Sequence, residues 1–335
     1  MQVHNDSKCG SSRRTGFEPG STVRVAFVNF WPDFDASAFL IPLLQARPFK
    51  FDVEVVAKRH ADIEICSVFR PKLEKLKRGV KRKLYRQVTG RTTHGLTPSR
   101  GKTSEPIRIW LTGENIRPPV DGWDVTLSFD VDSLSARNAY FPLWWQMFPE
   151  ILNSPDTASP GIVQVSRFWP LESYLSRREG EAGEREKFLC AVISNPEPTR
   201  MLALESLQRL GSVDVYGRVV GRPVHDKYEV FRNYQFALCF ESDLYPGYVT
   251  EKLFDAWGAG CIPLWWGLDR GSHLNPNAFV NLASLPGIDG LLVEVDRLLQ
   301  DERARRTMSS LPLLLRAPNL DGVRGMLARS LLNTA

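Results

Sequence analysis

The sequence predicts an α/β protein built from two Rossmann-like lobes that face a central cleft. Short apolar segments rich in β-branched residues alternate with helical segments along both halves of the chain, which is typical of parallel βαβ units. The alternation stops in a stretch rich in loop-forming and charged residues over 153–187 and then starts again. With 335 residues, the chain also suits two hydrophobic cores better than one.

The first half begins with a strand. Alternating apolar residues from Val23, followed by an apolar run to Phe30, predict a buried first strand. Apolar residues then recur with helical spacing, so we expect a helix over 36–45. The other strand candidates of this half are 51–56, 63–69, 107–111 and 125–129.

The second half repeats this order. Its expected strands are short apolar runs at 188–193, 213–216, 236–240 and 262–265. The segments between and beyond them have helical spacing and predict helices over 199–210, 226–234 and 249–259, and another after Pro318.

These patterns set the expected domain boundaries. Residues 1–20 are polar and lack the apolar run of a secretory signal, so they predict a disordered leader. The first lobe is expected over 21–165 and contains a basic insertion at 70–102. The second lobe is expected over 180–310, with a helical tail over 311–335.

Composition excludes several classes of protein. The five cysteines are odd in number and scattered, no Cys-x-x-Cys occurs, and the five histidines are isolated, which argues against structural zinc. Cysteines inside apolar runs are expected to be buried thiols, and this usage fits a reducing, cytoplasmic compartment. No run of eighteen apolar residues occurs, so the sequence predicts no membrane-spanning helix.

The positive charge is concentrated in the basic insertion. It holds twelve Lys or Arg and one acid, a balance of +11, whereas the whole chain carries +5; the sequence is therefore not a general nucleic-acid binder. One hypothesis is an amphipathic helix on an anionic membrane, each cation contributing about 1 kcal/mol. The alternative is a solvated insertion or a partner-binding arm, and Gly79 weakens the helix. The helically spaced apolar residues are Leu73, Leu76, Val80 and Leu84.

The segment 240–252 carries the strongest chemical signal. It reads as a strand, a turn with Gly and Pro, and a helix that begins at Thr250-Glu251-Lys252. The first turn of a helix presents unpaired N–H groups and the positive end of its dipole, and Lys252 adds a full charge, so this segment suits a diphosphate. Glu251 can accept hydrogen bonds from ribose hydroxyls. The alternative is that these residues only cap the helix.

Further blocks occur in order along the chain. Residues 111–115 read Leu-Thr-Gly-Glu-Asn, residues 191–196 read Ala-Val-Ile-Ser-Asn-Pro and are followed by Arg200, and residues 261–267 read Cys-Ile-Pro-Leu-Trp-Trp-Gly. Together with Tyr-Val-Thr-Glu-Lys at 248–252, they resemble the signatures of the α-1,3/1,4-fucosyltransferases, glycosyltransferase family 10, of bacterial type. The resemblance runs from about Val23 to Asn281, interrupted by the basic insertion.

The resemblance implies a GT-B fold, with the acceptor-binding lobe first and the GDP-sugar-binding lobe second. It implies an inverting hexosyltransferase that moves L-fucose from GDP-β-L-fucose to a hydroxyl of a glycan, as α-1,3-fucosyltransferases do. By analogy, Glu114 is the catalytic base, and Arg200 and Lys252 bind the donor diphosphate. The implied nucleotide and sugar contacts are Glu251, Tyr248, Ser242, Thr250 and Tyr216. The implied partners are GDP-fucose and an oligosaccharide or lipid-linked glycan, the latter if the enzyme is peripheral on the inner face of the membrane.

Glu114 is also interpretable without the family. It lies just after an expected strand, where open α/β sheets place ligands, and an inverting transfer needs a carboxylate to accept the acceptor's proton. The alternative is an ordinary solvated loop acid. Trp31, after the first strand, is a candidate for the wall of the acceptor cleft.

Some features depart from the family pattern or lead elsewhere. Ser242 stands where an Asn is usual and Gln235 where a Lys is frequent, so a related transferase with another nucleotide sugar is one alternative. A catalytically silent glycan-binding homologue is another, although the intact base and diphosphate cations argue against it.

Asp130-Val131-Asp132 has the spacing of a metal-binding DxD, which we interpret as a chance match that binds no metal. We therefore expect no essential metal, although a divalent ion could stimulate turnover. The tryptophan pairs at 144–145 and 265–266 are expected to pack in the core or between lobes.

Overall fold

The structure is a computed structural model that describes residues 16–31, 34–69, 105–119, 121–130, 136–152, 169–178 and 185–333. Most of the predicted leader and all of the basic insertion at 70–102 lie outside these residues, and so does the proposed membrane contact of that insertion.

The described part of the first lobe is built on one six-stranded sheet. Its strand order is β2-β1-β3-β4-β5-β6, and every neighbouring pair is parallel. Its strands are β1 (Thr22–Val28), β2 (Asp52–Val55), β3 (Ile63–Cys66), β4 (Ile107–Leu111), β5 (Val125–Ser128) and β6 (Asn138–Tyr140).

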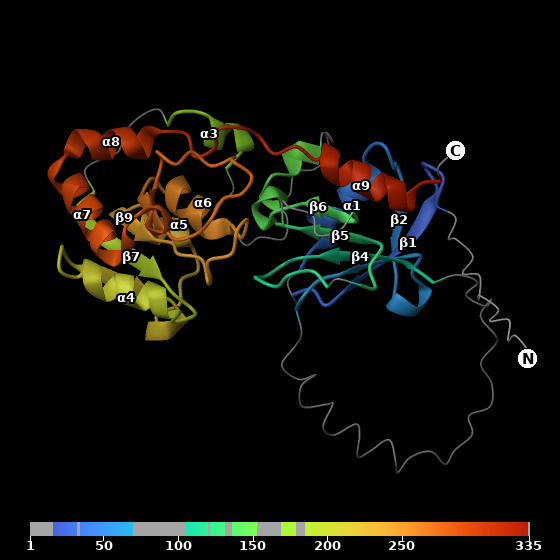
Figure 1. Cartoon of the computed structure of the whole chain (residues 1–335), viewed down its shortest axis with the longest axis horizontal. Coiled ribbons are helices and arrows are strands. Elements are labelled where there is room, and N and C mark those ends of the chain that lie inside the picture. The colour runs from blue at the N-terminus through green and yellow to red at the C-terminus, as the bar shows by residue number, and fades with distance from the viewer. Residues whose placement is uncertain are drawn as a thin grey trace, which may run out of the picture.

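The second lobe has a five-stranded parallel sheet in the order β11-β10-β9-β7-β8. This pair of parallel sheets confirms the predicted α/β class with two Rossmann-like lobes, which lie side by side in Figure 1. The strands of this sheet are β7 (Lys187–Val192), β8 (Val213–Tyr216), β9 (Tyr234–Leu238), β10 (Ile262–Trp265) and β11 (Val280–Asn281).

Helices cover both sheets. The predicted helix at 36–45 is present as a short 3-10 turn (Ala36–Ala38) and α1 (Leu40–Gln45), and the three predicted helices of the second lobe are also present. The α-helices after the first lobe are α3 (Leu171–Leu175), α4 (Pro198–Leu207), α5 (Lys227–Phe231), α6 (Glu251–Gly258), α7 (Gly287–Gln300), α8 (Glu302–Ser310) and α9 (Asp321–Leu331).

The last helix returns to the first lobe. The helix predicted after Pro318 is α9, and it packs on β5 and β6 rather than on the second sheet. In Figure 1, α9 lies over the first lobe, close to the C-terminal end of the chain. Its buried residues Val323, Met326 and Leu327 extend the first core.

Aromatic side chains join the lobes. Trp144, from the 3-10 segment Leu143–Met147, stacks on Phe254 of α6, with ring centroids 5.2 Å apart. Trp145 and Trp265 are also buried. The packing role predicted for the tryptophan pairs is therefore confirmed for these three side chains. The four cysteines in the described residues are buried free thiols, as their apolar surroundings predicted.

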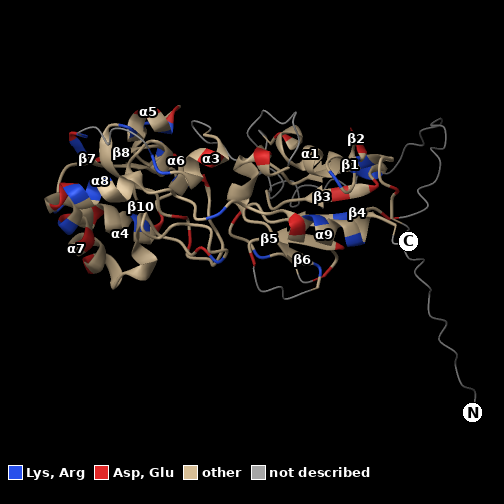
Figure 2. Cartoon of the chain, turned by 90° about the horizontal axis from the view of Figure 1, so that it is seen from above, with Lys and Arg blue, Asp and Glu red and all other residues tan. Residues whose placement is uncertain are grey.

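Charge is distributed over both lobes. Figure 2 shows Lys and Arg interspersed with Asp and Glu, notably around α7 and α8. Among the described residues, none of the helices is long and apolar enough to cross a bilayer.

Candidate active site at the lobe interface

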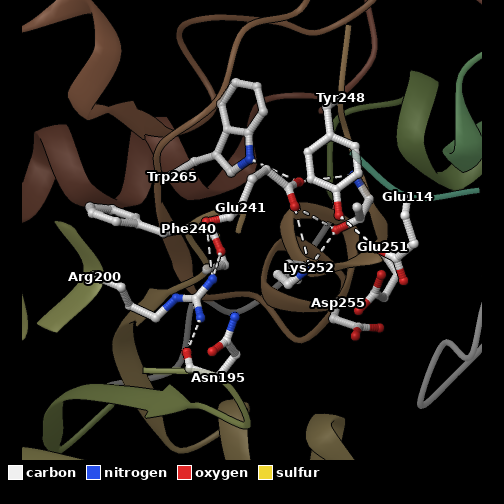
Figure 3. Close-up of polar contacts among 12 residues, drawn as sticks. Glu114, Asn195, Arg200, Phe240, Glu241, Tyr248, Glu251, Lys252, Asp255 and Trp265 are labelled. Carbon is white, nitrogen blue, oxygen red and sulfur yellow. Dashed lines mark hydrogen bonds and ion pairs between the residues drawn. The ribbon is translucent and has the colours of Figure 1, made fainter. Parts of the chain in front are cut away.

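The predicted site residues gather where strands end. Glu241 follows β9 and Asn195 follows β7, both at the carboxyl edge of the second sheet, and α6 begins there with Glu251. Glu114 follows β4 at the carboxyl edge of the first sheet. The carboxyl edges of the two sheets thus face one another. Ligands of open parallel sheets bind at such edges, so both lobes can contribute to one site. Figure 3 shows most of these side chains together.

Glu241, to which the sequence assigned no role, is the centre of this group. Its carboxylate is fully buried and accepts four hydrogen bonds (Figure 3). The Thr250 N–H and hydroxyl donate over 2.8 Å each, and the Lys252 ammonium and the Trp265 indole N–H over 3.3 Å each. A buried charge is stable only when it is paired and hydrogen-bonded in this way. The sequence signals were an acid directly after an apolar strand and the resemblance of Phe240-Glu241 to the start of the family signature, and neither gave Glu241 a role.

The interpretation of Thr250 as a helix cap is wrong. Thr250 occupies the N-cap position of α6, but its side chain does not bond to the N–H groups of the first turn. Its hydroxyl instead donates to Glu241 and accepts from the Lys252 ammonium over 2.9 Å. The N–H groups of the first turn of α6 are thus left without a side-chain cap from Thr250, as an anion-binding helix start requires.

Glu251 lies between two lysines. The Lys227 ammonium lies 3.3 Å from Glu251 and 2.7 Å from Asp255, one turn further along α6. Burial alone would raise the pKa of Glu251, but Lys252 and Lys227 lower it to about 2, so the carboxylate is ionised at neutral pH. Burial acts in the opposite sense on Lys252, and Glu251 and Glu241 overcome it to raise the Lys252 pKa. The structure therefore holds a fixed cation and a fixed anion at the start of α6.

Arg200 is buried, and its guanidinium donates to main-chain carbonyls. Its Nη1 donates to the Asn195 oxygen over 2.6 Å, and its Nη2 donates to the oxygens of Phe240 and Glu241 over 2.7 and 3.0 Å. These bonds tie the ends of β7 and β9 together. A guanidinium has five N–H donors, so three bonds do not use its full capacity. Its predicted contact with the diphosphate stays a prediction.

Glu114 projects from the first lobe toward the second. The Tyr248 hydroxyl lies 3.4 Å from its Oε2 atom. Although the Glu114 side chain is exposed to solvent, partial desolvation raises its pKa, while Lys252 and the Tyr248 hydroxyl act in the opposite direction. A carboxylate whose pKa is raised and that faces the other lobe is chemically suited to accept a proton, and the assignment of Glu114 as the base stays a prediction.

Three further residues behave differently. Tyr216 is not brought into this group: its hydroxyl lies 2.9 Å from that of Tyr234, and the Arg222 guanidinium covers its ring. Ser242 directly follows Glu241 and is half-buried. Gln235 lies near the amino end of β9, where its amide donates to the Arg185 carbonyl over 2.9 Å. Having Gln235 in place of a Lys therefore removes a positive charge from the amino end of β9, whereas the site lies at its carboxyl end.

A polar clasp closes the interface beside Glu114. We define the clasp as Arg117 and Asp130 of the first lobe with Tyr245 of the second. The Asp130 carboxylate accepts from the Tyr245 hydroxyl over 2.7 Å and from Arg117 over 2.9 Å, and the guanidinium of Arg117 lies 4.4 Å from the centre of the Tyr245 ring. The neighbouring Asn115 amide donates to Asp243 over 2.5 Å. The loop before α6 is thus anchored to the loop that carries Glu114.

We expect Asp130→Asn to lower kcat/KM by about 10- to 100-fold. Loss of hydrogen bonds to a charged group costs roughly 1.5–3 kcal/mol. Here that loss weakens the contact that fixes the position of the two lobes relative to one another. Steady-state transfer assays measure the effect, with Asp121→Asn, an exposed acid of the same lobe, as the matched control. Equal rates for Asp130→Asn and the control would show that the clasp does not fix the relative position of the lobes that transfer requires.

The clasp also accounts for the first acid of the DxD sequence. Asp130 bonds to protein groups from both lobes, and Asp132 lies outside the described residues. Within the described ranges, no three His, Cys, Asp or Glu side chains are grouped so that they could hold a metal ion.

The second lobe matches a known family. Residues 182–307 match the family model described as glycosyltransferase family 10 (fucosyltransferase), C-terminal. A relative from Helicobacter pylori, alpha-(1,3)-fucosyltransferase FucT, is 29% identical over 206 residues, which cover 54% of this chain and 42% of that protein. The 4-galactosyl-N-acetylglucosaminide 3-alpha-L-fucosyltransferase 9 of Homo sapiens is 33% identical over 99 residues, 28% of each chain. The matches thus span less than half the length of these curated relatives.

The solved structures extend the likeness to the whole fold. An alpha1,3-fucosyltransferase crystal structure superposes with a TM-score of 0.63 at 20% identity, covering 95% of this chain and 91% of that one. The same enzyme class with GDP-fucose gives a TM-score of 0.62 at 18% identity over 97% and 95% of the two chains. The predicted GT-B architecture is thereby confirmed.

Proposed function

We propose, from the premise that residues 182–307 are a glycosyltransferase family 10 domain, that the whole chain is an inverting fucosyltransferase. It would transfer L-fucose from GDP-β-L-fucose to a hydroxyl of a glycan acceptor. The observation that carries the proposal is the position of Glu114, which lies across the lobe interface beside Tyr248 and near enough to the helix start for the charges of Lys252 and Glu251 to act on its pKa. A base and a diphosphate site on facing edges are the two parts that such a transfer needs.

The reaction follows from these positions. The Glu114 carboxylate accepts the proton of the acceptor hydroxyl while the hydroxyl oxygen attacks the anomeric carbon. The bond from that carbon to the diphosphate breaks on the opposite face, so the configuration inverts and GDP leaves. Lys252 and the first turn of α6 stabilise the charge that develops on the diphosphate. The carboxylate of Glu251 is held in place to accept hydrogen bonds from the ribose hydroxyls. The proton of the acceptor hydroxyl ends on Glu114.

The proposal has further parts that are argued from the sequence and by analogy. They are the absence of an essential metal, a cytoplasmic location, attachment to an anionic membrane through 70–102, and an oligosaccharide or lipid-linked glycan as acceptor. The Asp130 contacts support the first of these, because the first acid of the Asp130-Val131-Asp132 sequence is bonded to protein groups instead.

Calorimetric titration with GDP-L-fucose, GDP-mannose and UDP-galactose, each alone, tests the donor. We expect selective binding of GDP-L-fucose, weakened about 10- to 100-fold by Lys252→Ala because a charged hydrogen bond to the diphosphate is lost. Lys187→Ala is the matched control, since Lys187 lies in the same lobe and pairs with Asp214 instead. Tighter binding of another nucleotide sugar would replace fucose as the donor, and binding of none would favour a silent glycan-binding protein.

A further inference from the structure

Lys227 occupies a position that the energetics of its own helix do not explain. It is the first residue of α5, directly after the N-cap Asp226, whose carboxylate accepts from the Tyr228 N–H over 2.8 Å. A cation in the first turn of a helix lies near unpaired N–H groups and the positive end of the dipole, which is unfavourable. Burial would lower the pKa of Lys227 further, but two carboxylates of α6, Glu251 and Asp255, raise it. The ammonium is thus held by α6 and not by its own helix.

The two acids of α6 hold this ammonium unequally. Glu251 and Asp255 are four residues apart, so their side chains lie on one face of the helix (Figure 3). The Asp255 side chain is 2% exposed and accepts from Lys227 over 2.7 Å. The Glu251 side chain is 21% exposed, and its Oε1 accepts from the same ammonium over 3.3 Å. Asp255 therefore anchors the lysine, whereas the Glu251 carboxylate keeps access to a ligand.

The other lysine beside Glu251 is bonded elsewhere. The Lys252 ammonium donates to Glu241 over 3.3 Å and to the Thr250 hydroxyl over 2.9 Å. It acts on the pKa of Glu251 through its charge. Among the residues that the structure describes, Lys227 is the cation within ion-pair distance of Glu251. The direction of the Glu251 carboxylate is therefore fixed from α5.

We infer that Lys227, anchored by Asp255, is a positioning residue for recognition of the nucleotide ribose. It holds the Glu251 carboxylate in the orientation that accepts hydrogen bonds from the 2′ and 3′ hydroxyls. This inference rests on the proposed function, in which Glu251 contacts the ribose. A glutamate side chain that rotates freely loses conformational entropy when it binds, which weakens the contact. The ion pair with Lys227 orders the side chain before the donor arrives.

Calorimetry with GDP and with 2′,3′-dideoxy-GDP, which lacks both hydroxyls, tests the inference. Wild type should bind GDP about 10- to 100-fold more tightly than the dideoxy compound, the effect of hydrogen bonds to a charged group. Lys227→Met should reduce this ratio about three- to tenfold, because Glu251 is no longer ordered. Lys227→Arg, which keeps a cation, should retain more of the ratio. Arg232→Met, which removes an exposed cation at the other end of α5, should leave it unchanged.

A double-mutant cycle shows whether Lys227 acts through Glu251. In a Glu251→Gln background the ratio is already reduced, and Lys227→Met should not reduce it further. An equal loss of affinity for both compounds in Lys227→Met would overturn the inference, because a general effect on folding or charge does not distinguish them. A further reduction of the ratio in the Glu251→Gln background would also overturn it.

The remaining outcomes separate this inference from the proposed function. A wild-type protein that does not bind GDP would contradict the proposed function. A wild-type protein that binds GDP and dideoxy-GDP equally would leave a nucleotide site in place and overturn the inference. If Lys227→Met does not fold because Asp255 is left unpaired, Lys227→Met/Asp255→Asn removes both charges of the pair. The same reduction of the ratio is expected in that variant, and a ratio equal to that of wild type would overturn the inference.

Discussion

Glu114→Gln is expected to reduce the rate of transfer by about 10²–10⁴-fold, the range that positioned general bases contribute. Glutamine keeps the size of the side chain and can still accept a hydrogen bond from Tyr248, but it cannot take the acceptor's proton. Binding of GDP-L-fucose should stay within about twofold of wild type, because the Glu241 cradle and the start of α6 are untouched. Single-turnover transfer assays together with calorimetry measure the two effects.

The pH dependence provides a second signature of the same residue. Desolvation raises the Glu114 pKa, and the base is active only when ionised, so turnover should fall as the pH drops through that raised pKa. Tyr248→Phe removes a hydrogen bond that lowers the pKa, so it should move this acid limb to higher pH. Glu114→Gln should abolish the limb.

An exposed acid of the first lobe serves as the control for both measurements. Glu54→Gln, on the edge strand β2, should leave rate and pH profile unchanged. Transfer by Glu114→Gln within a fewfold of the wild-type rate would exclude Glu114 as the base, whatever its place at the lobe interface.

Much of the fold could be predicted because its strands are buried and apolar. The segments 63–66 (Ile-Glu-Ile-Cys) and 125–128 (Val-Thr-Leu-Ser) are buried at every position, and in each the apolar residues recur at alternate positions, which is the period of a strand. The strands β6 and β11 were not predicted, because three and two residues are too few to show a period. The docking of α9 on the first lobe was also missed, since a helical pattern gives the apolar face but not the sheet that it covers.

The candidate site was predictable only in part. The positions of Glu251 and Lys252 followed from a motif that is local in sequence. The network around Glu241 joins side chains from the end of β9, the start of α6 and β10, and only the fold brings them together. The partner of Glu251 from α5, Lys227, was missed for the same reason. A motif thus located the helix start but not the buried charges that hold its side chains in place.

The second large effect is expected at Glu241. Each of its oxygens accepts two donors: the Thr250 N–H and the Trp265 indole on Oε1, and the Thr250 hydroxyl and Lys252 on Oε2. In Glu241→Gln one oxygen becomes an NH₂ group. The Thr250 hydroxyl can rotate to accept from it, but the Lys252 ammonium has no acceptor to offer. We expect a loss of about 3 kcal/mol in the free energy of unfolding, as for other broken buried pairs, and a Tm lower by roughly 6–12 °C.

Denaturant and thermal unfolding measure this loss, and a double-mutant cycle identifies its origin. Glu302→Gln, which breaks the exposed pair with Arg306, should change stability by less than about 0.5 kcal/mol. If the unpaired ammonium causes the loss, then Glu241→Gln made in a Lys252→Ala background should cost less than in wild type, by a coupling of roughly 0.5–3 kcal/mol. An equal cost in both backgrounds would assign the loss to Thr250 and Trp265 instead. Lys252 would then owe its position to Glu251 and the Thr250 hydroxyl, and donor affinity should survive Glu241→Gln.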